Sequence, residues 1–439
     1  MREKKYIKKE RVQKDPEDKN VFDSITDLCY GFFTYMKGSS NLKQSFAAIF
    51  LSIITDVLAG LFLGSLEETL LLLPGLIVLI PGAMSMRGNI FGALGSRLGT
   101  ALHMHRIDGF DMKSKYIRNN VYSSITLTIF TSIALAFIAR TLLLVVGFPS
   151  AGVLQLLLVS FIGGILSGAI LLFITFGITF LSHMKKWDPD NVTSPLITAF
   201  GDFFTIPSLA LAAHFILGIP VFYVMVMSVI VAAIAVINLV MVFTTESSHD
   251  AMVFRDGSYK NIVLQSVIVM LFAGTLSAAA GLILQSGLHD LINVAIIIAL
   301  VPAFLEEGGN IGNILSSRMS TRLHEGRLNA KLRIDSEIKR EIASSYILSL
   351  LVFPIVTVLV YLFGGALGAN IVLGKLLFAA TIAGLILTTI VIAVSIVVSV
   401  ISFRYKINPD NVTIPLITGT ADIVGVTTLL FIMRMFGIL

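Results

Sequence analysis

Eleven long apolar runs constrain what this chain of 439 residues can fold into. A helix needs ~20 residues to cross a hydrocarbon core, and the runs meet or exceed that length. They are continuous rather than alternating, which indicates helices rather than strands. The runs lie at about 44–64, 69–95, 121–147, 152–182, 193–217, 219–243, 261–286, 289–315, 343–366, 372–402 and 412–437. We therefore predict an all-α polytopic membrane protein with about eleven transmembrane helices.

The composition and the placement of charge agree with this fold class. The chain is 56% hydrophobic and 13% charged, about half the charged share of a soluble protein. If the N-terminus is cytoplasmic, 28 of the 32 Lys and Arg residues fall on the inner side. This bias predicts a cell-membrane protein with the N-terminus inside and the C-terminus outside. It also explains the net positive charge through membrane lipids rather than nucleic acid. Cys29 is the single cysteine, which excludes disulfides and cysteine-based metal sites.

Two sequence motifs occur twice. DPDNVTSPLITAFGD (188–202) returns 220 positions later as NPDNVTIPLITGTAD (408–422), with ten of fifteen residues identical. VLIPGAMSMRGNIFGALGSRLGTALH (78–103) aligns at a shift of 221 with ALVPAFLEEGGNIGNILSSRMSTRLH (299–324). Each half of the chain therefore holds five spans, with the motifs on its second and fifth.

The duplication predicts the domain organisation. A basic cytoplasmic segment is followed by two repeats that are separated by a linking helix and loop. The predicted boundaries are 1–43, 44–218 for repeat 1, 219–260 for the linker, and 261–439 for repeat 2. The extra span in the linker restores the orientation that five spans would invert. The repeats are then parallel and related by a pseudo-two-fold axis along the membrane normal.

Asp202 and Asp422 lie about ten residues into the fifth span of each repeat. A charge at that depth costs ~2.5–3.5 kcal/mol on insertion scales, so it needs a role. Each could be a packing residue bonded to a hydroxyl such as that of Thr198 or Thr205. Their equivalent positions favour another role, because two facing carboxylates would require a cation between them. Asp56, a third mid-span carboxylate, has no acidic counterpart in the repeat and is interpreted as a local packing residue.

The residues around the two aspartates indicate which cation would bind. Thr198 and Thr418 lie one turn before them, and Pro and Gly free backbone carbonyls nearby. Sites made only of oxygen suit Mg²⁺ or Ca²⁺, and a wide polar site with few carboxylates suits hydrated Mg²⁺. We predict Mg²⁺ as the bound and transported ion, with no organic cofactor. The sequence leaves Mn²⁺ and Co²⁺ open.

The second-span motif adds further candidates for the lining of a pore. Asn89 and Asn310 could offer oxygens to a hydrated ion, or they could bond to neighbouring helices. Glu306 and Glu307 have no acidic counterparts in repeat 1, where Arg87 brings a positive charge instead. We hypothesise that Arg87 pairs with one of these glutamates across the axis.

Three further acidic residues cluster where the fifth spans begin. Asp188, Asp190 and Asp410 stand beside prolines at the predicted cytoplasmic entrance, and Asn408 takes the place of a fourth carboxylate. Asp and Asn before a first turn are good helix caps, which is the favoured reading of Asp190 and Asp410. An ion site at the inner mouth is the alternative.

The paired motifs resemble the transmembrane domain of the MgtE magnesium channels. The tandem layout with an extra central span is similar to the SLC41 solute-carrier family. The resemblance covers about 44–438, and its most specific elements are PGAMSMRGN (81–89), PAFLEEGGN (302–310) and the Asp-bearing motif. It implies five-helix domains that enclose a pore on the axis, lined by the second and fifth helices.

The resemblance also implies roles for particular residues. The fifth-helix aspartate that holds a hydrated Mg²⁺ in that family corresponds to Asp202 and Asp422. The inner-mouth site of the family corresponds to Asp188, with Asn408 weakening the other half. Because the two domains are fused, the pore would be complete within one chain.

These observations predict transport of a divalent cation, most readily Mg²⁺, through a central pore. A Na⁺- or H⁺-coupled Mg²⁺ exchanger would use the same residues and is the alternative. An intramembrane aspartyl protease also has two membrane aspartates, but it requires Tyr-Asp and Gly-x-Gly-Asp. Here Asp202 follows Ala-Phe-Gly and Asp422 follows Gly-Thr-Ala, so neither motif is complete. We do not expect an enzyme.

Overall fold

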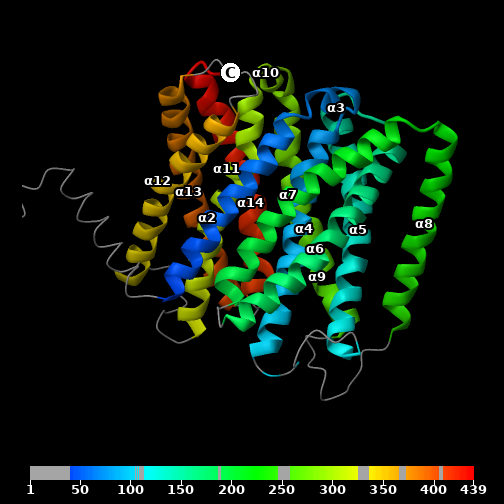
Figure 1. The fold of residues 1–439 in the computed structure, drawn as a ribbon, viewed down its shortest axis with the longest axis horizontal. Coiled ribbons are helices and arrows are strands. Elements are labelled where there is room, and N and C mark those ends of the chain that lie inside the picture. The colour runs from blue at the N-terminus through cyan, green and yellow to red at the C-terminus, as the bar shows by residue number, and fades with distance from the viewer. Residues whose placement is uncertain are drawn as a thin grey trace, which may run out of the picture.

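The computed structural model describes residues 40–103, 105, 107, 113–185, 189–245, 258–324, 336–364, 372–404 and 409–439. These residues form helices and connecting turns, without a strand. The long helices are tilted against one another in a single bundle (Figure 1). In the first half of the chain they are α2 (Ser40–Gly64), α3 (Glu67–Leu72), α4 (Leu76–His103), α5 (Lys115–Val146), α6 (Val153–Met184), α7 (Pro189–Leu217) and α8 (Val221–Thr244).

The second half repeats this order of helices. Its elements are α9 (Tyr259–Ser286), α10 (Leu288–Asn293), α11 (Ala295–His324), α12 (Ser336–Phe363), α13 (Leu373–Arg404) and α14 (Pro409–Met435). In the described part of the chain, ten helices are long and apolar enough to cross a membrane. The apolar part of α2, Phe50–Gly64, is shorter. The structure confirms the predicted class, a polytopic all-α membrane protein.

The second span of each half is interrupted, which corrects the continuous spans predicted at 69–95 and 289–315. In repeat 1 the short helix α3 ends before Pro74 and Gly75, and Gly75 has a φ of +97° that favours glycine. In repeat 2 the turn falls at Val294, between α10 and α11. Both short helices lie at the end of the bundle that also holds the C-terminus (Figure 1).

The first helix of each repeat crosses the second helix of the other repeat. α2 packs on α7 of its own half and on α11, and α9 packs on α14 and on α4. Glycines make these crossings possible. A Cβ on Gly60 would lie 1.8 Å from the Ala299 carbonyl oxygen, and one on Gly281 would lie 2.8 Å from the Val78 backbone. The two halves therefore interlock through backbone contacts at equivalent positions.

Close contacts also join the second and fifth helices within each repeat. A Cβ on Gly88 of α4 would lie 2.6 Å from the Thr198 methyl group on α7, and Gly309 of α11 lies against Thr418 on α14. Contacts between α4 and α14 and between α7 and α11 join the two pairs. These four helices meet at the centre of the molecule and position the candidate site.

Helix α8 stands at the edge of the bundle and packs weakly on α5, α6 and α9 (Figure 1). Most of its large apolar side chains are exposed, as expected for a helix that faces lipid. Thr126 of α5 donates a hydrogen bond to the Asn238 side chain of α8 (3.2 Å) and contacts the Tyr259 hydroxyl (3.0 Å). This polar contact joins the linking helix to α5, which in turn contacts α9.

The crossings predict that Gly60→Ala and Gly281→Ala destabilise the protein strongly. The added methyl group meets backbone, which cannot move aside as a flexible side chain could, so we expect a loss of about 3 kcal/mol or more in each case. Thermal unfolding in detergent, followed by the loss of the monodisperse peak in gel filtration, measures the effect.

Gly177→Ala is the matched control for this comparison. A Cβ at Gly177 meets no atom within 4 Å, and alanine is the better helix former by roughly 1 kcal/mol. The control should keep or raise the unfolding temperature. Equal unfolding temperatures for all three variants would contradict the interlocked packing.

Candidate functional site

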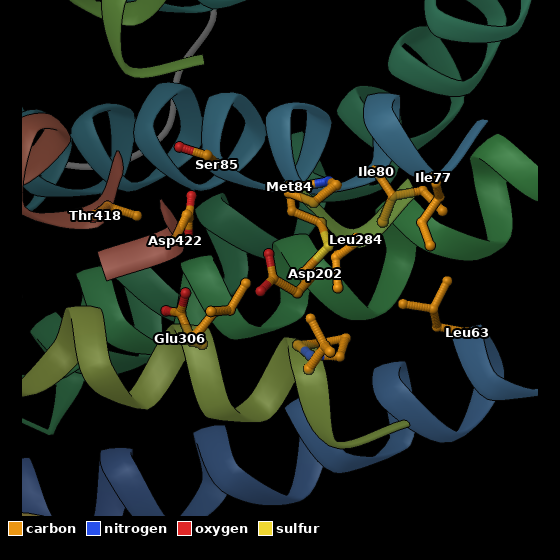
Figure 2. A pocket seen from close by; sticks show the side chains of 14 residues that line it. Leu63, Ile77, Ile80, Met84, Ser85, Asp202, Leu284, Glu306, Thr418 and Asp422 are labelled. Atoms are coloured by element: carbon orange, nitrogen blue, oxygen red, sulfur yellow. The ribbon is translucent and has the colours of Figure 1, made fainter. Parts of the chain in front are cut away.

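A small cavity lies where the two repeats meet, and equivalent residues from both halves line it. Figure 2 shows it between the helices, with acidic side chains toward one end and apolar side chains toward the other. The lining residues are Leu63, Ile77, Ile80, Pro81, Met84, Ser85, Asp202, Leu284, Val301, Pro302, Leu305, Glu306, Thr418 and Asp422. Most of them form pairs at the 220 or 221 shift, so both repeats contribute equivalent positions to the cavity.

Three carboxyl groups face this cavity. Asp202 on α7, Asp422 on α14 and Glu306 on α11 are all buried, and their carboxyl groups point toward a common space (Figure 2). They are close enough that the charges of Glu306 and Asp422 act on Asp202, and that of Asp422 acts on Glu306. The structure thus brings together both predicted aspartates, one predicted glutamate and the predicted Thr418.

Apolar side chains line the end of the cavity nearer to α3 and α10. Leu63 and Leu284 come from the ends of α2 and α9, and Ile80 and Val301 occupy equivalent positions on α4 and α11. All four are buried, with exposures of 1–3%. Met84 and Leu305 form a further equivalent pair beside the carboxyl groups. We call these six residues the outer seal, because they line the part of the cavity that lies toward that end of the bundle.

Asp56 lies close to the acidic group, in addition to the local packing role expected of it, in which the Ser52 hydroxyl one turn earlier donates a hydrogen bond to its carboxylate (3.0 Å). Its counterpart in repeat 2 is Ser277, whose hydroxyl donates a hydrogen bond to the Asp422 carboxylate (2.5 Å). Asp56 occupies the equivalent place on α2, where the charges of Glu306, Asp202 and Glu307 act on it. Its alignment with a serine concealed this role. The available signal was the presence of a charge in mid-span.

Glu307 and Asn310 lie beside this group but do not line the cavity. Glu307 is 1% exposed, and neither of its carboxyl oxygens has a hydrogen-bond partner. The side-chain nitrogen of Asn310, one turn further along α11, is also buried and lies close enough to act on Glu307, although no hydrogen bond of ordinary length joins them.

Arg87 points away from the axis, contrary to the hypothesis that it pairs with Glu306 or Glu307. Its guanidinium donates hydrogen bonds to the hydroxyls of Thr131 (3.4 Å) and Ser132 on α5. It also fills the space beside Gly164 of α6, where a Cβ would clash with it.

Repeat 2 fills the equivalent space with a different side chain. There the ring of Phe353 packs against Gly384, and the position of Arg87 is taken by Gly308. The space between these helices is therefore filled by the Arg87 guanidinium and its hydroxyl partners in repeat 1, and by an aromatic ring in repeat 2. The direction of Arg87 depends on its neighbours on α5, which the motif itself does not contain.

The remaining predicted residues lie further from the cavity. Asn89 is half-buried and its side-chain nitrogen donates to the Ser85 hydroxyl at 3.5 Å, while Thr198 is half-buried against Gly88. Asp188 lies outside the described residues. The side chains of Asp190 and Asp410 are not described either, although both residues lie in the first turn of a helix.

The described residues contain no group of three or more His, Cys, Asp and Glu side chains arranged to hold a metal ion directly. Mg²⁺ loses its waters reluctantly and commonly binds through one or two carboxylates. The pair of aspartates fits such an ion better than a fully dehydrated one.

Comparison with known proteins agrees with the duplicated architecture. The MgtE family, described as "Divalent cation transporter", matches residues 80–212 and 301–432. Solute carrier family 41 member 3 of Mus musculus is 25% identical over 378 residues, covering 81% of this chain and 74% of its own.

Further relatives match over a shorter region. Solute carrier family 41 member 2 of Xenopus laevis is 26% identical over 273 residues, covering 59% of this chain and 45% of its own. The human member 2 is 25% identical over 258 residues, covering 56% and 42%. This chain thus spans less than half the length of these two relatives. No solved structure matches. The two family matches together cover more than half of the chain and fall on both repeats, so this protein belongs to the MgtE family of divalent cation transporters.

Proposed function

We propose that this protein moves Mg²⁺ across the membrane along the pseudo-two-fold axis, with Asp202 and Asp422 as the central binding pair. The observation that carries the proposal is the shared cavity. Two equivalent aspartates from different repeats face it, both buried. In the described structure neither forms an ion pair with a basic side chain. Because isolated buried charges are costly, a cation is the natural partner for them.

The chemistry of the lining supports a hard, hydrated cation. Asp202, Asp422, Glu306, Ser85 and Thr418 offer only oxygen atoms, which suit Mg²⁺ better than Zn²⁺ or Cu²⁺. A hydrated ion can be held through its waters by carboxylates that stand too far apart to coordinate it directly. Mn²⁺ and Co²⁺ share this preference in part and serve as useful probes.

In this conformation the outer seal blocks the path of an ion between the carboxyl groups and the end of the bundle that holds α3 and α10. Apolar constrictions exclude water and with it hydrated ions, so the seal must open for transport to occur. With the N-terminus in the cytoplasm, the seal faces the outside of a cell membrane. An inside-negative potential would draw a divalent cation inward by ~4.6 kcal/mol per 100 mV, which suffices to drive uptake.

A coupled exchanger is the second candidate function. One divalent cation neutralises two carboxylates, but more than two carboxyl groups are buried near the cavity. This surplus favours an exchanger. Asp56, Glu306 and Glu307 are available for a second ion. Exchange against Na⁺ or H⁺ would allow transport against the membrane potential.

Replacing the central pair tests the proposal. Asp202→Asn/Asp422→Asn keeps the shape of both side chains and removes their charge. We expect Mg²⁺ uptake into liposomes that contain the protein to fall by about tenfold or more, because each ~1.4 kcal/mol of lost cation binding is a factor of ten. A Mg²⁺-sensitive dye inside the liposomes measures uptake.

Asp290→Asn is the control, because Asp290 is exposed, pairs with Arg434 (3.3 Å) and does not line the cavity. It should transport like the unchanged protein. Undiminished flux through the double variant would refute the binding role of the aspartates. Repeating the uptake with and without a Na⁺ or pH gradient separates a channel, which is indifferent to the gradient, from an exchanger.

The outer seal generates a separate prediction. Leu63→Ser/Leu284→Ser introduces two hydroxyls at equivalent positions and allows water into the constriction. We expect faster Mg²⁺ flux in the same assay, by about threefold or more, since wetting an apolar gate opens it. Leu211→Ser on α7 is the matched control, because that side chain is 66% exposed on the surface of the bundle. A seal variant no faster than this control would show that the constriction lies elsewhere.

A further inference from the structure

Arg87 is a buried positive charge that the proposed transport site does not use. Its side chain is 1% exposed, does not line the cavity, and lies between α4, α5 and α6. Among the described residues it forms no ion pair with an acidic side chain. A guanidinium stays ionised in proteins, and a charge inside a membrane is costly unless it is paired. Arg87 therefore lacks the negative partner that its position demands.

Most of the hydrogens that Arg87 can donate also lack an acceptor. A guanidinium carries five N–H donors. Arg87 donates to the hydroxyls of Thr131 (3.4 Å) and Ser132, while its Nε is buried without a partner. The Ser132 hydroxyl accepts from Arg87, so its own hydrogen remains to be donated. The Thr128 hydroxyl, one turn earlier on the same face of α5, is buried without a partner as well. This interface has more donors than acceptors.

Repeat 2 shows that the fold does not require a charge at this place. At the shift of 221, Arg87 corresponds to Gly308 and Ser132 corresponds to Phe353. The Phe353 ring packs into the space beside α13 that Arg87 and Ser132 share beside α6. Apolar packing therefore suffices between these three helices, and the guanidinium in repeat 1 serves some purpose besides filling space.

The neighbouring hydroxyl differs between the repeats in the same sense. Thr128 corresponds to Ser349, whose hydroxyl accepts a hydrogen bond from Thr388 (2.9 Å). The counterpart of Thr388 is Gly168, against which the Thr128 methyl group lies. The partner hydroxyl is thus absent from this position of repeat 1. Repeat 1 leaves polar groups unsatisfied where repeat 2 is apolar or fully bonded.

We propose that the interface of α4, α5 and α6 binds a small inorganic anion, such as chloride, held by the Arg87 guanidinium and the adjoining hydroxyls of Ser132 and Thr128. The site lies outside the cavity and takes a ligand of opposite charge, so the proposal goes beyond the proposed function. Ser85, two residues before Arg87 on α4, lines the cavity. An anion that fixes α4 against α5 and α6 would therefore also fix one wall of the cavity.

A monatomic anion fits this interface better than water or a larger ligand. Water can accept hydrogen bonds, but it does not balance the charge of a buried guanidinium. An anion does both, because it accepts from several donors at once. The helices also stand close together, since a Cβ on Gly164 of α6 would clash with both Arg87 and Ser132. This close approach suits chloride or bromide better than phosphate or a carboxylate-bearing molecule.

Thermal unfolding of the full chain in detergent tests the site. The protein is compared in sodium chloride and in sodium gluconate at equal ionic strength, because gluconate is too large for the interface. We expect chloride to raise the unfolding temperature by about 2 °C or more, since a ligand that binds only the folded state stabilises it. Arg87→Gly/Ser132→Phe, which installs the pair found in repeat 2, should unfold at the same temperature in both salts.

Arg118→Gln is the matched control, because Arg118 lies on α5 with its side chain exposed. It should respond to chloride like the unchanged protein. The anion site would be overturned if chloride had no effect on the unchanged protein, or stabilised Arg87→Gly/Ser132→Phe equally. If that variant does not fold, crystals of the unchanged protein grown in sodium bromide decide. An anomalous peak beside the Arg87 guanidinium is the expected result, and no peak there at saturating bromide would refute the proposal.

Discussion

Five carboxyl groups are buried within a membrane-spanning bundle, and the rest of the structure has to accommodate their charge. Asp56, Asp202, Glu306, Glu307 and Asp422 lie near the axis, and in the described structure none forms an ion pair with a basic side chain. Such a cluster is stable only with protons or cations among its members. Under the proposed function, the helices that surround it hold negative charge in position for a mobile positive ion.

The interlocking of the repeats keeps this scaffold together. Gly60 and Gly281 let the first helix of each repeat reach the second helix of the other, so the wall around the axis is built from both halves. Duplication supplied two equivalent aspartates, and later divergence supplied the differences. Asp56 and Glu307 place added acidity on one side, while Arg87 is turned outward among hydroxyls. The result is a symmetric frame around an asymmetric distribution of charge.

Much of this organisation could be predicted from the sequence, because hydropathy, charge bias and an internal repeat report on lipid, orientation and symmetry. The repeat identified Asp202 and Asp422, which the structure brings to one cavity. The repeat also led to an incomplete interpretation of one residue. It gave Asp56 little weight because its counterpart is a serine, although the hydrogen bond from that serine to Asp422 shows what the position faces. The direction of Arg87 depends on packing between helices, which no local pattern encodes.

The central claim is that a cation binds between the repeats at Asp202 and Asp422. Anomalous scattering from crystals grown with Mn²⁺, a divalent probe with similar ligand preferences, locates such an ion directly. The account predicts an anomalous peak in the axial cavity, between these two carboxyl groups and beside Glu306. It also predicts that this peak disappears in the Asp202→Asn/Asp422→Asn variant. A peak elsewhere in the bundle, with the cavity empty at saturating Mn²⁺, would contradict it.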